Sequence, residues 1–354
     1  MSKPQREKWW PRLLLVAGAT VLALFIGEVL LRILGLPHIH EPKEETPRFL
    51  PTNSREDAAL VYVNYPGRIT FTYDGNPRGY FGVLDEIHHQ VNPAGFRGAA
   101  FGAKLPGKRR VVFLGDSFTF GEGVRDDHTY AEITAQALNA EACNLGVGGY
   151  NTSQAAKALK TVGLGLEPDA VILGYVPNDA EPPLFMIDPQ TGQPLRRNRE
   201  ASIEWEAGPQ KAPTSMLYRS RLAQLVWQLS QQQRLGKQTV SYYQSLYAAD
   251  SEGWRESEEA LREIIGLCRE RDIPCVVLMF PILVDLSESH PFASIHEQVG
   301  RVVRDAGGIF VDLLPAVKGQ DARDLRVHPT DQHPNERVHA IVGELLAETL
   351  REHE

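Results

Sequence analysis

From residue 109 onward, apolar residues occur in two alternating patterns, unbroken runs and helical spacing. Runs of consecutive apolar residues are typical of buried strands, whereas apolar residues at every third or fourth position are typical of helices with one buried face. The runs predict strands at residues 111–114, 142–145, 168–174, 273–280 and 308–313. The helical spacing predicts helices at residues 128–140, 152–164, 214–234, 254–271, 292–306 and 335–350. Strands that alternate with helices favour an α/β fold, in which helices cover both faces of a parallel sheet.

Two long segments lack both patterns. Residues 37–90 are rich in Pro, Gly, Tyr and charged residues, and we expect them to form a stalk with a few irregular strands. Residues 180–213 are rich in Pro, Gly and charge, which is typical of an insertion or a lid. We therefore predict a globular domain over residues 91–354 that carries this insertion and is connected by the stalk to the N-terminal residues.

The N-terminal part contains a long apolar stretch from Leu13 to Leu36. It carries no charge before Glu28, and Arg32 follows four residues later, so these two residues can pair on one helix face. A helix of this length measures about 36 Å at roughly 1.5 Å per residue, which exceeds a hydrocarbon core of about 30 Å. We expect a transmembrane anchor over residues 13–36.

Residues 1–12 indicate how this anchor is oriented. They are basic, and Trp9 and Trp10 stand where aromatic residues gather at a membrane interface. We therefore expect a cytoplasmic tail, with the remainder of the chain outside the cytoplasm, in the periplasm. A cleaved signal peptide and a buried core helix are the alternatives. Cleavage normally follows small residues, but residues 28–32 read Glu-Val-Leu-Leu-Arg, so we favour the uncleaved anchor.

Charge and composition narrow the classes of function. The chain has a net charge of −8 although its tail is basic, so the body is strongly acidic and we expect no nucleic-acid partner. A hydrophobic content of 42% is that of a globular protein. Cys143, Cys268 and Cys275 form no zinc pattern, and we expect no metal or organic cofactor. Export would permit a bridge between Cys268 and Cys275, and two buried free thiols are the other interpretation.

Polar loops follow the first three predicted strands. They contain Ser117, Gly149 and Asn178, and a fourth polar segment before the last helix contains Asp331 and His333. The carboxyl ends of parallel strands lie at one edge of a sheet, so we expect these residues to lie close together.

These residue types are the parts required for acyl transfer. A serine hydroxyl is inert until an imidazole removes its proton, and the carbonyl oxygen under attack needs fixed hydrogen-bond donors. The backbone N–H groups of Ser117 and Gly149 and the amide of Asn178 are candidate donors. Each feature also has a structural interpretation, because Gly-Asp-Ser is a common capped turn and Asn-Asp a common turn after a strand.

In combination, the motifs resemble the SGNH (GDSL-type) serine hydrolase family over roughly residues 90–350. The matching stretches are Gly115-Asp116-Ser117, Gly149, Asn178-Asp179 and Asp331 with His333; Asn92–Arg97 and Phe118–Gly121 resemble exported, membrane-anchored members. The resemblance implies a flavodoxin-like three-layer α/β/α fold. It also implies Ser117 as nucleophile, His333 as base and Asp331 as the residue that orients the base, with Ser117, Gly149 and Asn178 as the oxyanion hole. The commonest family spacing has Asp three residues before His, where this chain has Thr330.

A second histidine, His328, also precedes a proline, and Asp324 is its possible partner. We favour His333 as the base because it stands at the start of the last helix with Asp331 two residues away. We therefore expect a membrane-tethered esterase or O-acyltransferase that acts on a small-molecule or polysaccharide ester outside the cytoplasm. The alternative from another class is a tethered carbohydrate-binding or scaffold protein that has kept the fold without the chemistry.

Overall fold

Five strands form the central parallel sheet of the computed structural model. They are β5 (Arg110–Leu114), β6 (Glu141–Asn144), β7 (Ala170–Tyr175), β10 (Cys275–Met279) and β11 (Ile309–Asp312). Their order across the sheet is β11-β10-β7-β5-β6, and every neighbouring pair is parallel. Counted from the first strand this is the flavodoxin-like order 2-1-3-4-5, in which the connections change direction between the first and third strands. That point lies between β5 and β7.

The structure describes residues 9–36, 53–182, 185–187, 194–196, 219–329 and 331–353. They belong to two units, one containing residues 1–46 and 199–241 and the other containing residues 47–198 and 242–354. The larger unit holds the sheet, whose strands confirm the five predicted from the sequence. Strands β5, β7 and β10 are buried along their whole length, which explains why they read as unbroken apolar runs.

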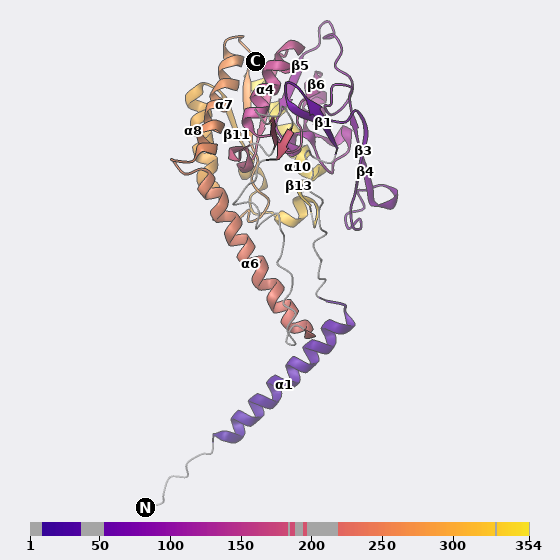
Figure 1. Cartoon of the computed structure of the whole chain (residues 1–354), viewed down its shortest axis with the longest axis vertical. Helices are drawn as coiled ribbons and strands as arrows, with labels where there is room; N and C mark the ends of the chain where they lie inside the picture. The colour runs from indigo at the N-terminus through magenta and orange to yellow at the C-terminus, as the bar shows by residue number, and fades with distance from the viewer. Residues whose placement is uncertain are drawn as a thin grey trace, which may run out of the picture. The chain divides into compact units, whose positions relative to one another are not determined.

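Helices cover both faces of the sheet, so the predicted three-layer α/β/α fold is confirmed. The main ones in this unit are α3 (Tyr130–Ala137), α4 (Thr152–Thr161), α7 (Glu252–Arg269), α8 (Ala293–Ala306) and α10 (Glu336–Glu352). Helix α3 packs against α10. Helix α7 packs against both α4 and α8 (Figure 1). The core under α3 and α10 joins Val338, Val342 and Leu346 to Val111 and Phe113 of the sheet. Apolar residues at helical spacing in α10 therefore face the sheet.

Short elements complete the larger unit. They are the helices α2 (Ser117–Phe120) and α9 (Leu314–Val317), the 3-10 turns at Val83–Asp85, Asp126–His128, Gly163–Leu166, Pro177–Ala180 and Ala322–Leu325, and the hairpin of β12 (Arg326–His328) and β13 (Asp331–Pro334). The predicted insertion at 180–213 lies mostly outside the described residues; within it, β8 (Phe185–Ile187) pairs with β9 (Pro194–Arg196). All three cysteines are buried free thiols.

The described part of the expected stalk contains two antiparallel strand pairs. These are β1 (Ser54–Asp57) with β2 (Val61–Asn64), and β3 (Gly67–Thr72) with β4 (Glu86–Val91). Residues 53–90 belong to the larger unit. The hydroxyl of the buried Tyr62 donates a hydrogen bond to the carbonyl of Gly148 at 3.0 Å, and the Tyr150 hydroxyl donates to the Tyr62 carbonyl at 2.5 Å. This segment therefore packs on the loop that follows β6.

The smaller unit contains α1 (Trp10–Ile33) and the first part of α6 (Arg221–Leu246). Among the described residues, α1 is the one helix long and apolar enough to cross a membrane, and none of its residues is buried. The expected Glu28–Arg32 pair is present at 2.7 Å. Glu28 also accepts hydrogen bonds from the backbone N–H groups of Arg221 and Leu222, each at 3.0 Å. It thereby pairs donors that a helix N-terminus leaves open.

Helix α6 extends to Leu246, beyond the predicted end at residue 234. Its later turns contain polar helix-forming residues such as Lys237 and Gln238, which carry no apolar period. Residues 214–218 of the predicted helix lie outside the described residues.

A buried arginine holds the loop between α2 and α3. The Arg97 side chain is 2% exposed and forms an ion pair with Asp126 at 2.7 Å. Its guanidinium donates further hydrogen bonds to the carbonyls of Phe120, Gly121 and Val124 at 2.6–2.9 Å. One side chain thus satisfies three buried carbonyl groups and neutralises a carboxylate, which fixes the loop from residue 120 to residue 126.

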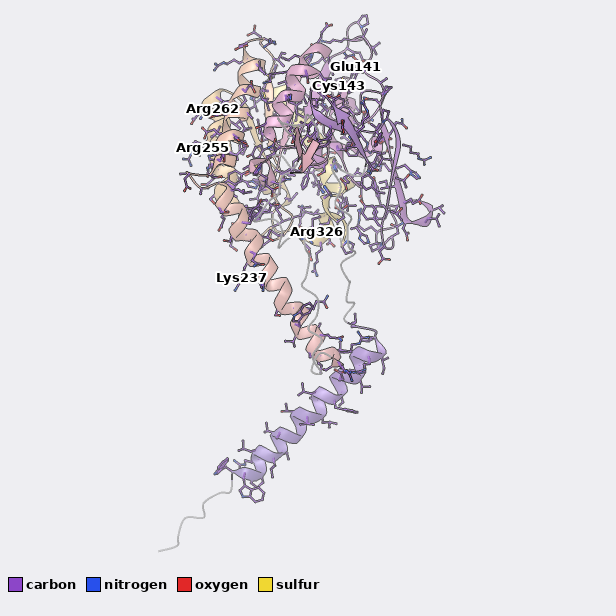
Figure 2. All side chains as sticks on the ribbon, viewed as in Figure 1. Glu141, Cys143, Lys237, Arg255, Arg262 and Arg326 are labelled. Atoms are coloured by element: carbon purple, nitrogen blue, oxygen red, sulfur yellow. The ribbon has the colours of Figure 1, made fainter. Side chains whose placement is uncertain are left out.

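We expect Arg97→Met to lower the free energy of unfolding by about 3–5 kcal/mol, because it removes the counter-charge of Asp126 and the hydrogen bonds that three buried carbonyls accept from the guanidinium. Urea titration of the detergent-solubilised chain, followed by circular dichroism, measures this change. The control is Arg262→Met on α7 (Figure 2), which breaks the half-exposed pair with Glu258 and should cost less than about 1 kcal/mol. Equal losses in the two variants would contradict this role of Arg97.

Candidate active site

Ser117 is the first residue of α2, immediately after β5. Gly115 has φ 144°, and a Cβ there would lie 2.7 Å from the carbonyl oxygen of Gly174. The turn therefore needs glycine at this position. Asp116 caps α2, because its carboxylate accepts a hydrogen bond from the Phe118 N–H at 2.9 Å. The chain thus leaves the sheet sharply and presents Ser117 at the carboxyl end of β5.

His333 and Asp331 both lie on β13. His333 Nε2 is 2.7 Å from Ser117 Oγ, and His333 Nδ1 is 2.5 Å from Asp331 Oδ1. The backbone N–H of His333 donates to the same carboxylate oxygen at 3.0 Å. A carboxylate that accepts a hydrogen bond from the N–H two residues later closes a compact turn. The spacing of two residues therefore lets the Asp331 carboxylate reach the His333 ring. The structure therefore joins the predicted serine, histidine and aspartate in one hydrogen-bonded chain.

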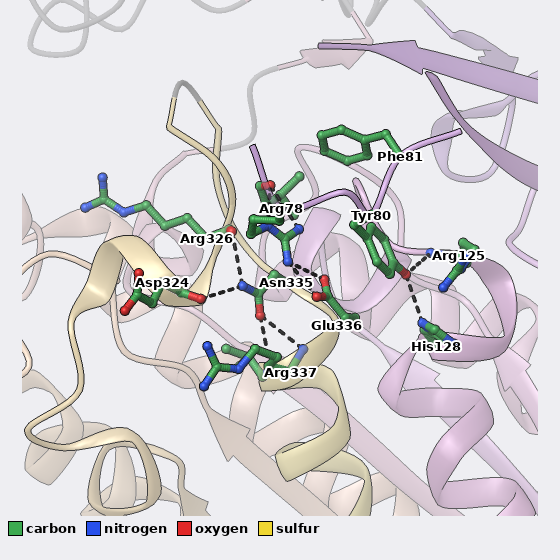
Figure 3. Close-up of polar contacts among 12 residues, drawn as sticks. Arg78, Tyr80, Phe81, Arg125, His128, Asp324, Arg326, Asn335, Glu336 and Arg337 are labelled. Carbon is green, nitrogen blue, oxygen red and sulfur yellow. Dashed lines mark hydrogen bonds and ion pairs between the residues drawn. The ribbon is translucent and has the colours of Figure 1, made fainter. Parts of the chain in front are cut away.

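Asn335 fixes the end of this hairpin at the start of α10 (Figure 3). Its side-chain oxygen accepts hydrogen bonds from the N–H groups of Arg337 and Val338. Its amide nitrogen donates to the carbonyls of Asp324 at 2.8 Å and Arg326 at 3.2 Å. One buried residue thereby caps the helix and ties it to the segment before the hairpin, which positions His333 between them.

Tyr73 contacts the other oxygen of Asp331 and was not predicted. Its hydroxyl donates a hydrogen bond to Asp331 Oδ2 at 2.9 Å, and its ring stacks on Phe81 with centroids 4.4 Å apart. Burial raises the pKa of Tyr73, so the hydroxyl remains a donor. Both oxygens of Asp331 are therefore occupied, which fixes the plane of the carboxylate. The irregular sequence around Tyr73 gave no signal of this contact.

The predicted oxyanion donors come from three neighbouring loops. Asn178 lies in the 3-10 turn after β7, and its amide nitrogen donates to Asp116 Oδ2 at 3.2 Å. Asp116 therefore orients Asn178 while capping the helix that begins at Ser117, and the second amide hydrogen of Asn178 remains available. The backbone N–H groups of Ser117 and Gly149 donate to no other residue in the described part of the chain.

Gly148 and Gly149 bring the loop after β6 close to the serine. A Cβ built on Gly148 would lie 3.9 Å from Ser117 Cβ. Gly149 has φ 81°, a conformation that favours glycine, and a Cβ there would lie 3.0 Å from the Tyr62 hydroxyl oxygen. The structure therefore places Gly148, the residue before Gly149, close to Ser117.

A third acidic residue, Glu122, also lies next to His333 and was not predicted. Ligand-type atoms of Glu122, Asp331 and His333 lie within 4.8 Å of one another, the one such group of three in the described chain. Both ring nitrogens of His333 are engaged by Ser117 and Asp331, so the ring offers a cation no free ligand atom. The pair of glycines around Glu122 is the sequence signal that predicts a tight turn beside Ser117.

The charges of this site favour protonation of His333. Burial of the ring lowers its pKa, but the carboxylates of Glu122, Asp331 and Asp116 outweigh this effect and raise the pKa of His333 to about 9. Burial raises the pKa of Asp331, yet the hydrogen bond and charge of His333 bring the net pKa below its ordinary value. Burial raises the pKa of both Glu122 and Asp116. The imidazolium form of His333 is thus surrounded by carboxylates.

His328 occupies a different environment. It is 5% exposed, its Nε2 lies 3.2 Å from the Asp74 carbonyl oxygen, and its ring packs near Tyr73 and Phe81. The contact that the structure shows for Asp324 here is made by its backbone carbonyl, which accepts a hydrogen bond from Asn335. The geometry thus assigns His328 to the packing behind Asp331.

The chain was compared with known proteins. The model of the GDSL-like lipase/acylhydrolase family matches residues 113–341. A search of curated proteins found no match. Similar solved structures include a G-D-S-L family lipolytic protein from Desulfitobacterium hafniense, 12% identical with TM-score 0.40 over 68% of this chain and 99% of that one. A GDSL-like lipase from Bacteroides thetaiotaomicron is 12% identical with TM-score 0.39, over 72% and 93%.

A two-domain esterase active on acetylated mannans is 15% identical with TM-score 0.38, over 69% of this chain and 49% of that chain. The family assignment rests on the sequence match, which spans more than half of the chain and includes the loops of Ser117, Gly149, Asn178 and His333. The protein therefore belongs to the GDSL-like lipase/acylhydrolase family and is an esterase of that type.

Proposed function

We propose that this chain is a membrane-anchored serine esterase that forms an acyl-enzyme at Ser117 and acts on a polar ester outside the cytoplasm. The observation that carries the proposal is the hydrogen-bonded chain from Asp331 through His333 to Ser117, with distances of 2.5 and 2.7 Å. This arrangement gives a hydroxyl an immediate proton acceptor and gives the acceptor a fixed counter-charge.

In the first half-reaction, Ser117 Oγ attacks the ester carbonyl while His333 Nε2 takes the hydroxyl proton. The bond between Oγ and the carbonyl carbon forms, and the carbonyl oxygen becomes an oxyanion. The N–H groups of Ser117 and Gly149 and the Asn178 amide stabilise this oxyanion. Its collapse breaks the ester C–O bond, and the leaving alcohol takes the proton from His333. The acyl group remains on Ser117.

In the second half-reaction, an acceptor hydroxyl replaces the alcohol. His333 removes its proton as it attacks the acyl-enzyme, and the proton returns to Ser117 when the acyl group leaves. Water as the acceptor gives hydrolysis, whereas a sugar hydroxyl gives acyl transfer. Asp331 holds the imidazole in the tautomer with the proton on Nδ1 in both halves, and the Tyr73 hydroxyl holds Asp331.

We propose an acylated carbohydrate as the substrate. Several groups around the reacting residues are small or polar, namely Gly148 beside Ser117, Asn178 beside Asp116 and Glu122 beside His333. Such surroundings suit a short acyl group on an alcohol that carries further hydroxyls. Anchoring by α1 is proposed from its length and apolar surface, with the basic residues before it in the cytoplasm.

The first test asks which residues activate the serine. A fluorophosphonate probe should label the detergent-solubilised chain at Ser117, and both labelling and ester hydrolysis should vanish in Ser117→Ala. His333→Ala should be about as severe, and the losses should not add, because the two residues act as a unit. Asp331→Asn should also be severe because it removes the charge that stabilises the imidazolium.

His328→Ala is the matched control and should lose far less activity than His333→Ala. An inactive His328→Ala with an active His333→Ala would contradict the assignment and make Asp324 the candidate partner. Absence of labelling in the wild-type chain would favour a binding or scaffold protein without chemistry.

Asn178→Ala should reduce turnover roughly 10²- to 10³-fold, or about 2.7–4 kcal/mol of transition-state stabilisation, because one oxyanion donor is lost. The loss should appear in kcat with the thermal unfolding midpoint little changed. Turnover close to the wild-type value would show that Asn178 serves only the turn after β7.

A reporter fused to the C-terminus should be active only outside the cytoplasm, because the basic tail retains the N-terminus inside. Mass spectrometry of the membrane-bound protein should recover residues 1–36 intact. A shortened protein, free in the exported fraction, would contradict anchoring and support a cleaved signal peptide.

A further inference from the structure

The strongest unassigned feature is the turn that carries Glu122. Gly121 and Gly123 have φ values of 78° and 76°, so both adopt the left-handed conformation that favours glycine. The turn folds back on α2, and the N–H groups of Gly121 and Glu122 both donate to the Ser117 carbonyl, at 2.9 and 3.1 Å. A Cβ on Gly123 would lie 2.7 Å from the Tyr73 hydroxyl oxygen. The two glycines thus place Glu122 between Ser117 and Tyr73, the residue that donates a hydrogen bond to Asp331.

This turn is held rigidly from outside. The Arg97 guanidinium donates to the Gly121 and Val124 carbonyls, which flank the Glu122 position on both sides. The N–H of Gly123 donates to Nε2 of the buried His89 at 3.1 Å. The backbone of Glu122 is therefore fixed on both sides.

The Glu122 carboxylate points at the reacting groups. One of its oxygens lies within 4.8 Å of a ring nitrogen of His333 and of an Asp331 oxygen. Its Oε2 lies 4.0 Å from the position of a Cβ on Gly148, in the loop of the proposed oxyanion donors. No described residue donates a hydrogen bond to this partly buried carboxylate. Its neighbours are therefore the histidine and the space around Ser117.

The charged and titratable groups around His333 come from every adjoining element. Asp331 belongs to β13 and accepts the Tyr73 hydroxyl, Asp116 caps α2, and Glu122 follows α2. His339 of α10 is buried, and burial lowers its pKa to about 3, so it stays neutral. Arg97 pairs with Asp126 and also donates to the backbone of the turn that carries Glu122. Glu122 is thus the one carboxylate near His333 without a hydrogen bond to a described group.

We propose that Glu122 is a positioning residue of this site, a second carboxylate that stabilises the imidazolium form of His333 during both proton transfers. This inference rests on the proposed function, because it requires His333 to be the base for Ser117. An opposite charge at about 4–6 Å favours a protonated imidazole. The carboxylate therefore makes His333 a stronger base and also delays its deprotonation to higher pH.

These two effects have opposite consequences on the two sides of the pH profile. The neutral imidazole is the form that accepts the serine proton. In Glu122→Gln, loss of the charge lets His333 lose its proton at lower pH, so the acidic limb of kcat/KM moves to lower pH by about 1. At high pH, where His333 is neutral in both proteins, the variant is about tenfold slower because its imidazolium has lost a counter-charge.

The experiment measures kcat/KM for p-nitrophenyl acetate from pH 5 to about 10, on detergent-solubilised full-length chains. The wild-type acidic limb should lie well above pH 6.5, the ordinary pKa of histidine. Glu122→Asp keeps the charge and should retain the wild-type limb, although its shorter side chain lowers the plateau. The matched control is Glu132→Gln, because Glu132 is also partly buried, lies on α3 and makes no side-chain hydrogen bond among the described residues.

Glu132→Gln should leave the profile unchanged. A Glu122→Gln limb that superimposes on the wild-type limb overturns the proposal, as does a wild-type limb at or below pH 6.5. If Glu122→Gln does not fold, the role of Glu122 is decided by two measurements: the acidic limb of kcat/KM in Glu122→Asp and the acidic limb in the wild-type chain. Fluorophosphonate labelling of Ser117 at pH 9 separates the two claims: absence in the wild type refutes the proposed function, whereas labelling with superimposed limbs refutes only the role of Glu122.

Discussion

The hydrogen bond between His333 and Ser117 joins residues 216 positions apart in the sequence, and the rest of the site is organised to make it. A serine hydroxyl gives up its proton only to a base within hydrogen-bond reach. The fold meets this condition by placing Ser117 at the end of β5 and by returning the chain to the same edge just before α10. In the flavodoxin-like strand order, the connections leave β5 and β7 in opposite directions, so the loops after these two strands diverge at this edge. Asn178 lies in the loop after β7.

Short polar contacts fix each participant before any substrate binds. Asp116 caps α2 and orients Asn178, so the proposed nucleophile and one proposed oxyanion donor are held by the same residue. Asn335 caps α10 and ties the hairpin that carries His333. Arg97 holds the turn that carries Glu122. In each case a buried polar residue satisfies backbone groups, which makes the local conformation costly to change.

The sheet and much of the candidate site were predictable from sequence because their signals are local. Unbroken apolar runs predicted all five strands, and polar loops at strand ends predicted that Ser117, Asn178 and His333 would lie at one edge. Tyr73 was not predictable, because it stands in a segment without any period and reaches Asp331 only through tertiary packing. Glu122 was within reach of sequence analysis: glycines on both sides of it, beside the serine, indicate a tight turn. Hydrogen bonds between distant loops, such as Asn178 to Asp116, require coordinates.

The central claim is that acyl transfer passes through Ser117. Rapid mixing of the solubilised chain with excess p-nitrophenyl acetate, quenched in acid and followed by peptide mass spectrometry, tests it most directly. We expect a burst of p-nitrophenol close to one equivalent per chain, with acetyl on the peptide containing Ser117. Steady release of p-nitrophenol with acetyl-Ser117 still trapped would also support the claim, because the acetylated serine is the proposed intermediate. Acetyl on a different residue, or hydrolysis with neither a burst nor acetyl-Ser117, would contradict the claim.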